Sequence, residues 1–185
     1  MVDTTNTIYS FVAQGTTPEV TQARFDRARN SKLVLSGKRV IKRATEGQTE
    51  REFEMLTRAA QKGVSVPHCI QIDECTLSLQ FIPHGETIWD HLQHNTLTQD
   101  MLNAVKAELV RMWKVGIVHG DLHINNILVD TDANVYIIDM ASSWDAKVLT
   151  NTFGEDDYSA DVEEGIAADL EAFKTSFKTA RAELG

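Results

Sequence analysis

The segment 118–142, VHGDLHINNILVDTDANVYIIDMAS, constrains the fold of this 185-residue chain more than any other feature. A polar loop leads into two short apolar runs, Ile127–Val129 and Val135–Ile138, and a polar turn separates them. This pattern predicts a β-hairpin. Because a hairpin brings its two ends together, we expect Asn126, before the first strand, to lie near Asp139, after the second.

Three oxygen-bearing side chains belong to this predicted site. Asp121 lies five residues before Asn126, and Asp139 lies thirteen residues beyond Asn126. Carboxylate and amide oxygens are the ligands that Mg²⁺ prefers, and the ion completes its shell with water and substrate phosphates. The alternative interpretation is a surface loop with unrelated polar residues before an ordinary hairpin. The order and spacing of the loop, the hairpin and the final aspartate favour the metal site.

This segment resembles the catalytic and metal-binding loops of the protein-kinase-like superfamily. The family motif H-R-D-L-x-x-x-N corresponds to residues 119–126, HGDLHINN. The resemblance implies that Asp121 accepts the proton of the attacking hydroxyl, and that Asn126 and Asp139 hold Mg²⁺ against the phosphates of ATP. For His123, contact with the γ-phosphate and a structural or solvent-facing role are both open interpretations.

The first half of the chain has the pattern of short strands around one helix. Runs rich in β-branched or aromatic residues predict strands at 8–13, 32–35, 39–42, 68–72 and 76–82. Gly47 is expected to break the chain, and an amphipathic helix follows from about Thr49 to Lys62. Gly63 suits the end of that helix, and Pro67 prevents its continuation.

A lysine that binds phosphate is expected in the first half of the chain. Val40-Ile41-Lys42 resembles the V-A-I-K strand of the family, which implies that Lys42 contacts the α- and β-phosphates. Lys38 is the rival candidate on the same strand, and an ordinary exposed lysine is the plain alternative for both. The two apolar residues before Lys42 favour it.

The lysine needs an acidic partner from the next helix, and the candidates are Glu46, Glu50, Glu52 and Glu54. The spacing of these residues leaves the choice open. The run 52–67, EFEMLTRAAQKGVSVP, resembles the corresponding region of the small atypical kinase of the KEOPS tRNA-modification complex, and that resemblance selects Glu52. RIO kinases and lipopolysaccharide-core sugar kinases share the same style of catalytic loop.

The phosphate-covering loop of the family has its weakest counterpart here. Residues 14–20, QGTTPEV, contain the single glycine Gly15 rather than G-x-G-x-x-G. Backbone N–H groups around Gly15 can still cover phosphates, and a plain β-turn is the equal alternative.

The second half of the chain becomes helical after a break at Pro83–Gly85, where we place the boundary between two lobes. Thr87 and Thr98 suit the N-caps of two helices. The resemblance and the pattern together predict an α+β fold of minimal bilobal kinase type, with a β-rich N-lobe at 1–82 and a helical C-lobe at 83–185.

A terminal helix is predicted from about Asp161 to Glu183, with apolar residues at steps of three or four. Asp161 and Glu164 resemble a capping box at its start. A brace for the catalytic loop is expected among Asp157, Asp161 and Asp169, and the sequence leaves the choice open.

Composition limits the partners. The net charge is -9, so we expect no broad nucleic-acid binding. No apolar run approaches the length of a membrane span, and the start of the chain lacks the pattern of a secretion signal. For Cys69 and Cys75, a disulfide or unlinked residues of paired strands in a reducing cytosol are the two interpretations. We expect a cytoplasmic protein with a protein substrate or regulatory partner.

These features predict an ATP- and Mg²⁺-dependent phosphotransferase, specifically a small atypical serine/threonine protein kinase capable of autophosphorylation. Two alternatives are a kinase for a sugar or other small molecule, and an ATP-binding or ATP-hydrolysing module that regulates a larger complex.

Overall fold

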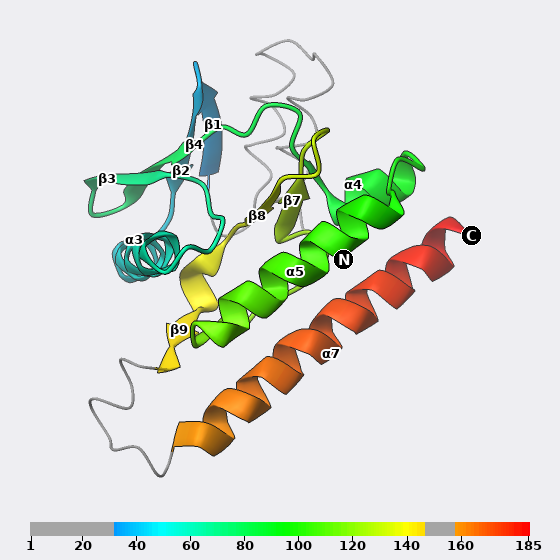
Figure 1. The fold of residues 1–185 in the computed structure, drawn as a ribbon. Helices are drawn as coiled ribbons and strands as arrows, with labels where there is room; N and C mark the ends of the chain where they lie inside the picture. Colours follow the sequence, from blue (N-terminus) through cyan, green and yellow to red (C-terminus); the bar gives the residue numbers. More distant parts are fainter. Residues whose placement is uncertain (1–31, 147–157) are drawn as a thin grey trace.

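A computed structural model describes residues 32–146 and 158–185 of the chain. A β-sheet with one helix forms the N-terminal part of this described structure, and a largely helical part follows (Figure 1). The predicted α+β architecture with two lobes is confirmed. The predicted strand at 8–13 and Gly15 lie outside the described residues.

The N-terminal sheet has four antiparallel strands in the order β1-β2-β4-β3. Their bounds are Lys32–Ser36 for β1, Arg39–Arg43 for β2, Cys69–Asp73 for β3 and Thr76–Gln80 for β4. Gly37 has a φ of 59° in the tight turn between β1 and β2, a conformation that glycine adopts readily. Along β2, Val40 and Lys42 are buried while Arg43 is exposed, as the alternation of a half-covered sheet requires.

Helix α3, Glu46–Gln61, packs against β3 and β4. It begins before the predicted start at Thr49, so the expected break at Gly47 is wrong. Gly47 lies in the first turn, where backbone N–H groups have no partner within the helix and a glycine costs little. The helix ends at Gln61, one residue before the predicted end, with Lys62 as its C-cap, and Gly63 follows with a φ of 80°.

The C-terminal part contains helices α4, α5 and α7. Helix α4 spans Ile88–Gln93 and begins with a capping box between Thr87 and Asp90. Helix α5 spans Gln99–Lys114 and is capped by Thr98. Helix α7, Tyr158–Leu184, runs alongside α5 (Figure 1).

The predicted capping box at Asp161 and Glu164 is wrong, because α7 begins at Tyr158. Asp161 therefore lies inside the first turn, where its negative charge faces the positive end of the helix dipole.

Two small sheets complete the C-terminal part. The first has the order β5-β7-β8, and the second pairs β6 with β9. Their bounds are Glu86–Thr87 for β5, Ile127–Val129 for β7, Val135–Ile137 for β8, Ile117–Val118 for β6 and Trp144–Asp145 for β9. A short 3-10 helix, η1 at Met140–Ser142, connects the predicted hairpin to β9.

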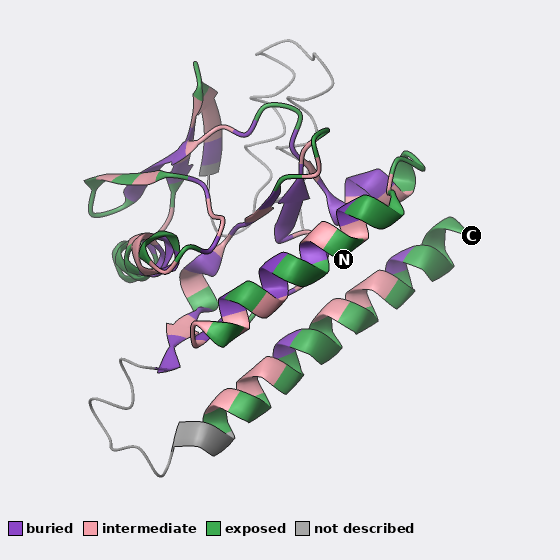
Figure 2. Ribbon diagram, in the orientation of Figure 1, coloured by how far each residue is buried: buried purple, intermediate pink, exposed green. Residues whose placement is uncertain are grey.

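The core runs continuously from the N-terminal sheet through the hairpin to α5, where the purple segments of Figure 2 meet. Cys69 lies in β3 and Cys75 just before β4, and both are free thiols. Among the described residues, no helix is long and apolar enough to span a membrane.

Candidate active site

Lys42 stands at the centre of a buried group of three charged side chains. Its Nζ lies 2.8 Å from Glu52 Oε2 and 2.9 Å from Asp139 Oδ1. The side chains of Lys42 and Glu52 are only 8% and 2% exposed, and that of Asp139 is 28% exposed. Strand β2, helix α3 and the end of the β7–β8 hairpin each contribute one member, so the group joins both parts of the fold.

The structure selects Glu52 from the four predicted partners. Glu52 shares the buried face of α3 with Met55, Leu56 and Ala59, whereas the other three glutamates are exposed. Lys38, the rival lysine, lies in the exposed turn between β1 and β2. The location of Lys42 on the inner face of the sheet follows from its alternation with Ile41.

Burial and ion pairing act in opposite directions on these three groups. Burial disfavours the charge of Lys42, but the facing carboxylates of Glu52 and Asp139 raise its pKa above the ordinary lysine value. Burial raises the pKa of Glu52 despite the opposing effect of Lys42. Burial also acts to raise the pKa of Asp139, but the charge and hydrogen bond of Lys42 outweigh it and leave this pKa lowered. With all three groups ionised, the site carries one excess negative charge.

The catalytic loop predicted at 119–126 lies between β6 and β7. His119 is fully buried, and its Nε2 lies 3.0 Å from the carbonyl oxygen of Ile138, so we assign the Nε2 proton to that bond. Its Nδ1 then accepts the backbone N–H of Asp121 at 3.3 Å. Burial lowers the pKa of His119, in agreement with a neutral structural imidazole. The carboxylate of Asp121 itself is 59% exposed.

Gly120 allows this loop to approach the segment after Asp139. Its φ is 78°, and a Cβ at this position would collide with the carbonyl oxygen of Ser142. Only glycine fits such a close approach of two backbones.

The hairpin brings Asn126 next to Ile138, the residue between β8 and Asp139. The backbone oxygen of Asn126 accepts the N–H of Ile138 at 3.0 Å, and the Asn126 side-chain Nδ2 donates to the carbonyl oxygen of Asp121 at 2.9 Å. Asp139 has a φ of 59°, a left-handed conformation that is uncommon for a residue other than glycine. Unusual backbone of this kind is often found at functional sites.

These residues fit a magnesium ion. Asp139 offers a partly exposed carboxylate, Asn126 offers an amide, and both are hard oxygen donors. A cation here would also neutralise the excess negative charge beside Lys42. No cluster of three or more His, Cys, Asp or Glu side chains suitable for a metal occurs within 32–146 and 158–185. A magnesium site completed by water and phosphates needs no such cluster.

The His123 side chain lies between those of Asn126 and Asp121. Its Nε2 is 3.1 Å from Asn126 Nδ2 and 3.9 Å from Asp121 Oδ2, and its Nδ1 accepts the N–H of Asn125 at 3.2 Å. The side chain is therefore adjacent to the expected base and to an expected metal ligand.

Asp169 is the brace that the sequence left open. Its carboxylate accepts the backbone N–H groups of His119 and Gly120 at 2.8 and 2.9 Å, and the indole N–H of Trp113 at 3.2 Å. Asp161 is exposed, and Asp157 lies outside the described residues.

The other end of the loop is also held by α7, because the N–H of Ile124 donates to Ser176 Oγ at 3.2 Å. Asp169 and Ser176 are two helical turns apart on one face. The signal for Asp169 was present in the sequence, since Asp169 falls three residues after Ile166 on the apolar stripe of α7.

An antiparallel sheet with one helix, followed by a catalytic-type loop and a hairpin on a helical base, defines the protein-kinase-like class of folds. Within that class, the profile of the RIO domain family matches residues 17–152. The chain therefore belongs to the RIO domain family.

Two curated relatives are similar to the chain over about half of its length. It is 29% identical over 96 residues to a 3-deoxy-D-manno-octulosonic acid kinase of Vibrio vulnificus strain CMCP6, a match that covers 48% of this chain and 41% of the relative. It is also 29% identical over 96 residues to the KEOPS complex subunit Bud32 of Pyrococcus abyssi, covering 50% of this chain and 43% of the relative. The chain spans less than half the length of these relatives.

Among solved structures, the co-crystal structure of WbdD with the kinase inhibitor LY294002 has a TM-score of 0.52 at 17% identity. The match covers 69% of this chain and 35% of WbdD. At this level of identity, the likeness shows the fold alone.

Proposed function

We propose that this protein is an ATP-dependent phosphotransferase, and specifically a small atypical serine/threonine protein kinase capable of autophosphorylation. The observation that carries the proposal is the Lys42 ammonium group held between Glu52 and Asp139 at 2.8–2.9 Å. Membership of the RIO domain family supports the same activity.

Each member of the buried charge group has a proposed role. Lys42 binds the α- and β-phosphates of ATP, and Glu52 fixes the direction of its ammonium group. Asn126 and Asp139 hold Mg²⁺, which when bound neutralises phosphate charge. Because these groups are already oriented, little reorganisation is needed when charge develops on the transferred phosphoryl group.

Asp121 is the proposed base. Its exposed carboxylate can accept the proton of an incoming hydroxyl while the hydroxyl oxygen bonds to the γ-phosphorus and the bond to the β-phosphate oxygen breaks. The backbone of Asp121 is fixed by His119 and Asn126, so its side chain starts from a defined position. His123 is proposed to contact the γ-phosphate from its place beside Asn126.

The acceptor class has two candidates. A protein serine or threonine, including one of this chain, is the leading proposal because the carboxylate of Asp121 is open to solvent. The match to a sugar kinase of Vibrio vulnificus favours a small hydroxylated acceptor as the second candidate.

The proposal includes a protein partner and a cytoplasmic location. The match to a subunit of the KEOPS complex supports an assembly with other proteins. The free thiols of Cys69 and Cys75 agree with a reducing compartment, where ATP is also available.

The test is transfer of labelled γ-phosphate from ATP in the presence of Mg²⁺, with three acceptors: the protein itself, a protein substrate mixture, and 3-deoxy-D-manno-octulosonic acid. Asp121→Ala and Asp139→Ala should each lower the transfer rate by about 10²–10⁴-fold. Asp132→Ala, at an exposed aspartate of the turn between β7 and β8, is the matched control and should keep the rate of the wild type.

The destination of the label separates the candidates. Label on protein supports the leading proposal, label on the sugar supports the second, and free phosphate alone indicates an ATPase module. No label released or transferred by the wild type, or equal rates in the wild type and Asp139→Ala, would refute the proposed phosphotransferase.

A further inference from the structure

The segment that follows α3, residues 62–65, is fastened to the C-terminal part of the fold. Lys62 caps α3, and its side chain leaves the helix towards β6 and β9. Its Nζ lies 2.7 Å from the carboxylate of Asp145 and 3.0 Å from the carbonyl oxygen of Val115. The Lys62 side chain is 23% exposed and that of Asp145 is 4% exposed, so solvent screens this ion pair weakly.

Both contacts of Lys62 lie next to the candidate active site along the chain. Val115 precedes β6, which leads directly into His119 and the catalytic loop. Asp145 lies in β9, which follows Asp139 and η1. Strands β6 and β9 pair with each other, and Ile117 lies opposite Asp145. Lys62 therefore binds at the β6–β9 pair, which connects the catalytic loop after β6 with the segment that runs from Asp139 to β9.

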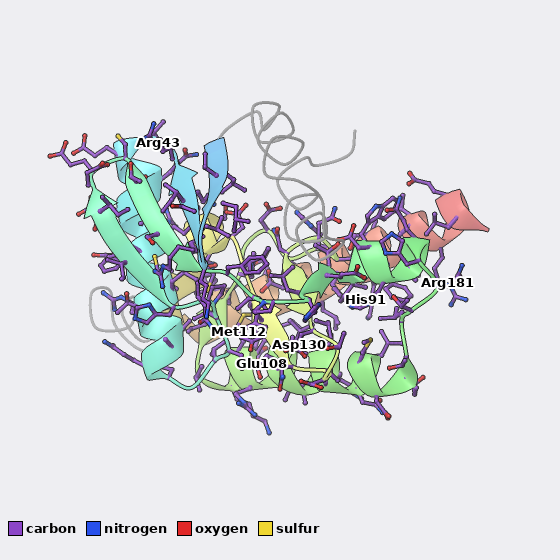
Figure 3. All side chains as sticks on the ribbon, turned by 90° about the horizontal axis from the view of Figure 1, so that it is seen from above. Arg43, His91, Glu108, Met112, Asp130 and Arg181 are labelled. Carbon is purple, nitrogen blue, oxygen red and sulfur yellow. The ribbon has the colours of Figure 1, made fainter. Side chains whose placement is uncertain are left out.

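Further polar contacts hold the rest of the segment. The N–H of Ser65 donates to Glu108 Oε1 on α5 at 2.6 Å, and the Ser65 carbonyl oxygen accepts the N–H of Ile137 at 2.9 Å. Glu108 is buried and lies one turn before Met112 on α5 (Figure 3). The carbonyl oxygen of Gly63 accepts from Arg111 at 3.3 Å. The C-terminal end of α3 is therefore fixed in direction as well as in place.

The length of α3 makes the position of Glu52 sensitive to the orientation of the C-terminal end of the helix. Glu52 lies ten residues before Lys62, which is about 15 Å along a helix. A rigid helix that rotates slightly about its C-terminal end moves Glu52 by a larger amount, and a shift of about 1 Å breaks a hydrogen bond of 2.9 Å. The apolar face of α3 provides attraction without direction, whereas a short ion pair defines an orientation.

We propose that Lys62 and Asp145 form a positioning pair, which fixes α3 against the β6–β9 pair and thereby keeps the Glu52 carboxylate in its ion pair with Lys42. Neither residue touches the reacting groups. The consequence for activity rests on the proposed function, but the position of α3 can be tested without any activity.

Cys69 provides that test. It lies in β3 beneath α3, and burial together with the nearby Glu52 carboxylate raises the pKa of its thiol to about 12. Its labelling by a thiol reagent at pH 8 should therefore be slow, and displacement of α3 should accelerate it. Cys75 is exposed and is the only other cysteine of the chain, so Cys75→Ser gives a background with one reporting thiol.

In this background, Lys62→Met should label Cys69 about tenfold faster than the parent, a size typical of mutations within a coupling network. Lys62→Arg keeps the positive charge and should stay within about twofold of the parent. Lys106→Met, which removes an exposed lysine of α5, is the control for loss of charge and should label at the parental rate. Circular dichroism and thermal unfolding establish that each variant is folded.

Parental labelling in a folded Lys62→Met variant would overturn the proposal. If Lys62→Met does not fold, Asp145→Asn serves as the second variant, because the asparagine still accepts a hydrogen bond from Lys62 while the charge is lost. It should accelerate labelling about threefold, and the parental rate in this variant would equally overturn the proposal.

The activity assay then separates this inference from the proposed function. In Lys62→Met, kcat/KM for ATP should fall about tenfold, and Lys62→Arg should restore it. Faster labelling of Cys69 with no phosphate transfer even by the wild type would reject the proposed function and leave the positioning pair standing. Phosphate transfer by the wild type, with unchanged labelling of Cys69 in the folded variants, would support the proposed function and reject the positioning pair.

Discussion

The candidate active site contains a cluster of three paired charges and one separate carboxylate, and the two differ in their exposure to solvent. Lys42 and Glu52 are buried, Asp139 is partly buried, and the three are paired at 2.8–2.9 Å, whereas the carboxylate of Asp121 is 59% exposed. Charges interact strongly where water is excluded and weakly where it is not. Substitutions in the three-residue cluster should therefore affect both stability and the proposed binding of phosphate, while Asp121 can be changed with little effect on folding.

Loss of Lys42 should have the largest effect on stability. Lys42→Met leaves the carboxylates of Glu52 and Asp139 facing each other without a cation, which should lower the free energy of unfolding at pH 7 by about 3 kcal/mol in urea denaturation. Their pKa values in the folded variant then rise above the unfolded values of about 4. The loss of stability in Lys42→Met is therefore present at pH values above about 4. It should decrease as the pH falls through the raised pKa values of Glu52 and Asp139 in the folded variant.

Lys38→Met is the control for this prediction, because Lys38 lies in an exposed turn. It should change the free energy of unfolding by less than about 0.5 kcal/mol. An equal loss in both variants, or a loss in Lys42→Met that stays constant from pH 7 to pH 4, would contradict the assignment of a buried charge group.

The packing beneath the catalytic loop should show the next largest effect. A Cβ on Gly165 of α7 would lie 2.7 Å from Trp144 Cζ2 and 3.0 Å from Val118 Cγ1. Gly165→Ala should lower the free energy of unfolding by about 1–2 kcal/mol, despite the better helix propensity of alanine. Gly47→Ala meets no atom within 4 Å and should stabilise the protein by about 0.5 kcal/mol. Thermal unfolding of both variants tests this prediction. Stabilisation by both substitutions would disprove the close packing of Gly165 against Trp144 and Val118.

Glu52→Gln should have a smaller effect on stability. Burial raises the pKa of Glu52, so its charge costs free energy at pH values above the unfolded pKa of about 4.3, and the cost is relieved as the pH falls through the folded pKa. The variant leaves Lys42 paired with Asp139 alone. We expect a change within about 1 kcal/mol at pH 7, while kcat/KM for ATP falls at least about tenfold.

Glu54→Gln, at an exposed position of the same helix, is the matched control and should change neither quantity. A loss of stability in Glu52→Gln as large as that in Lys42→Met would show that Glu52 and Asp139 do not share one cation.

Asp121→Ala should have the smallest effect on stability, within about 0.5 kcal/mol, because the side chain is exposed. The same sample should transfer phosphate about 10²–10⁴-fold more slowly than the wild type. Urea denaturation and the transfer assay on one preparation provide both values. A variant that loses activity only in proportion to its folded fraction would assign Asp121 to the scaffold rather than to the reaction.

The hairpin between Asn126 and Asp139 could be predicted from the sequence because its signal is local. Apolar runs, a polar turn and a terminal aspartate follow each other within a few residues, so no distant contact is needed to bring the ends together. Glu52 was selected by resemblance. The helical period alone also places it with Leu56 and Ala59, on the face that the structure buries.

Features that depend on distant contacts could not be predicted. The pairing of β6 with β9 involves only two residues from each strand, and the Lys62–Asp145 ion pair joins residues 83 positions apart. The helix boundaries near Gly47 and Asp161 were wrong because each helix extends one turn further than its local signals indicate.

Gly120 has a consequence for how the proposed phosphotransferase could be controlled. Kinases with an H-R-D motif carry an arginine at the corresponding position. Here the backbone of Ser142 occupies the space that any side chain at position 120 would need. A phosphate added to the segment after Asp139 would meet no guanidinium group at this point. In the proposed phosphotransferase, position 120 therefore supplies no side chain that could bind such a phosphate.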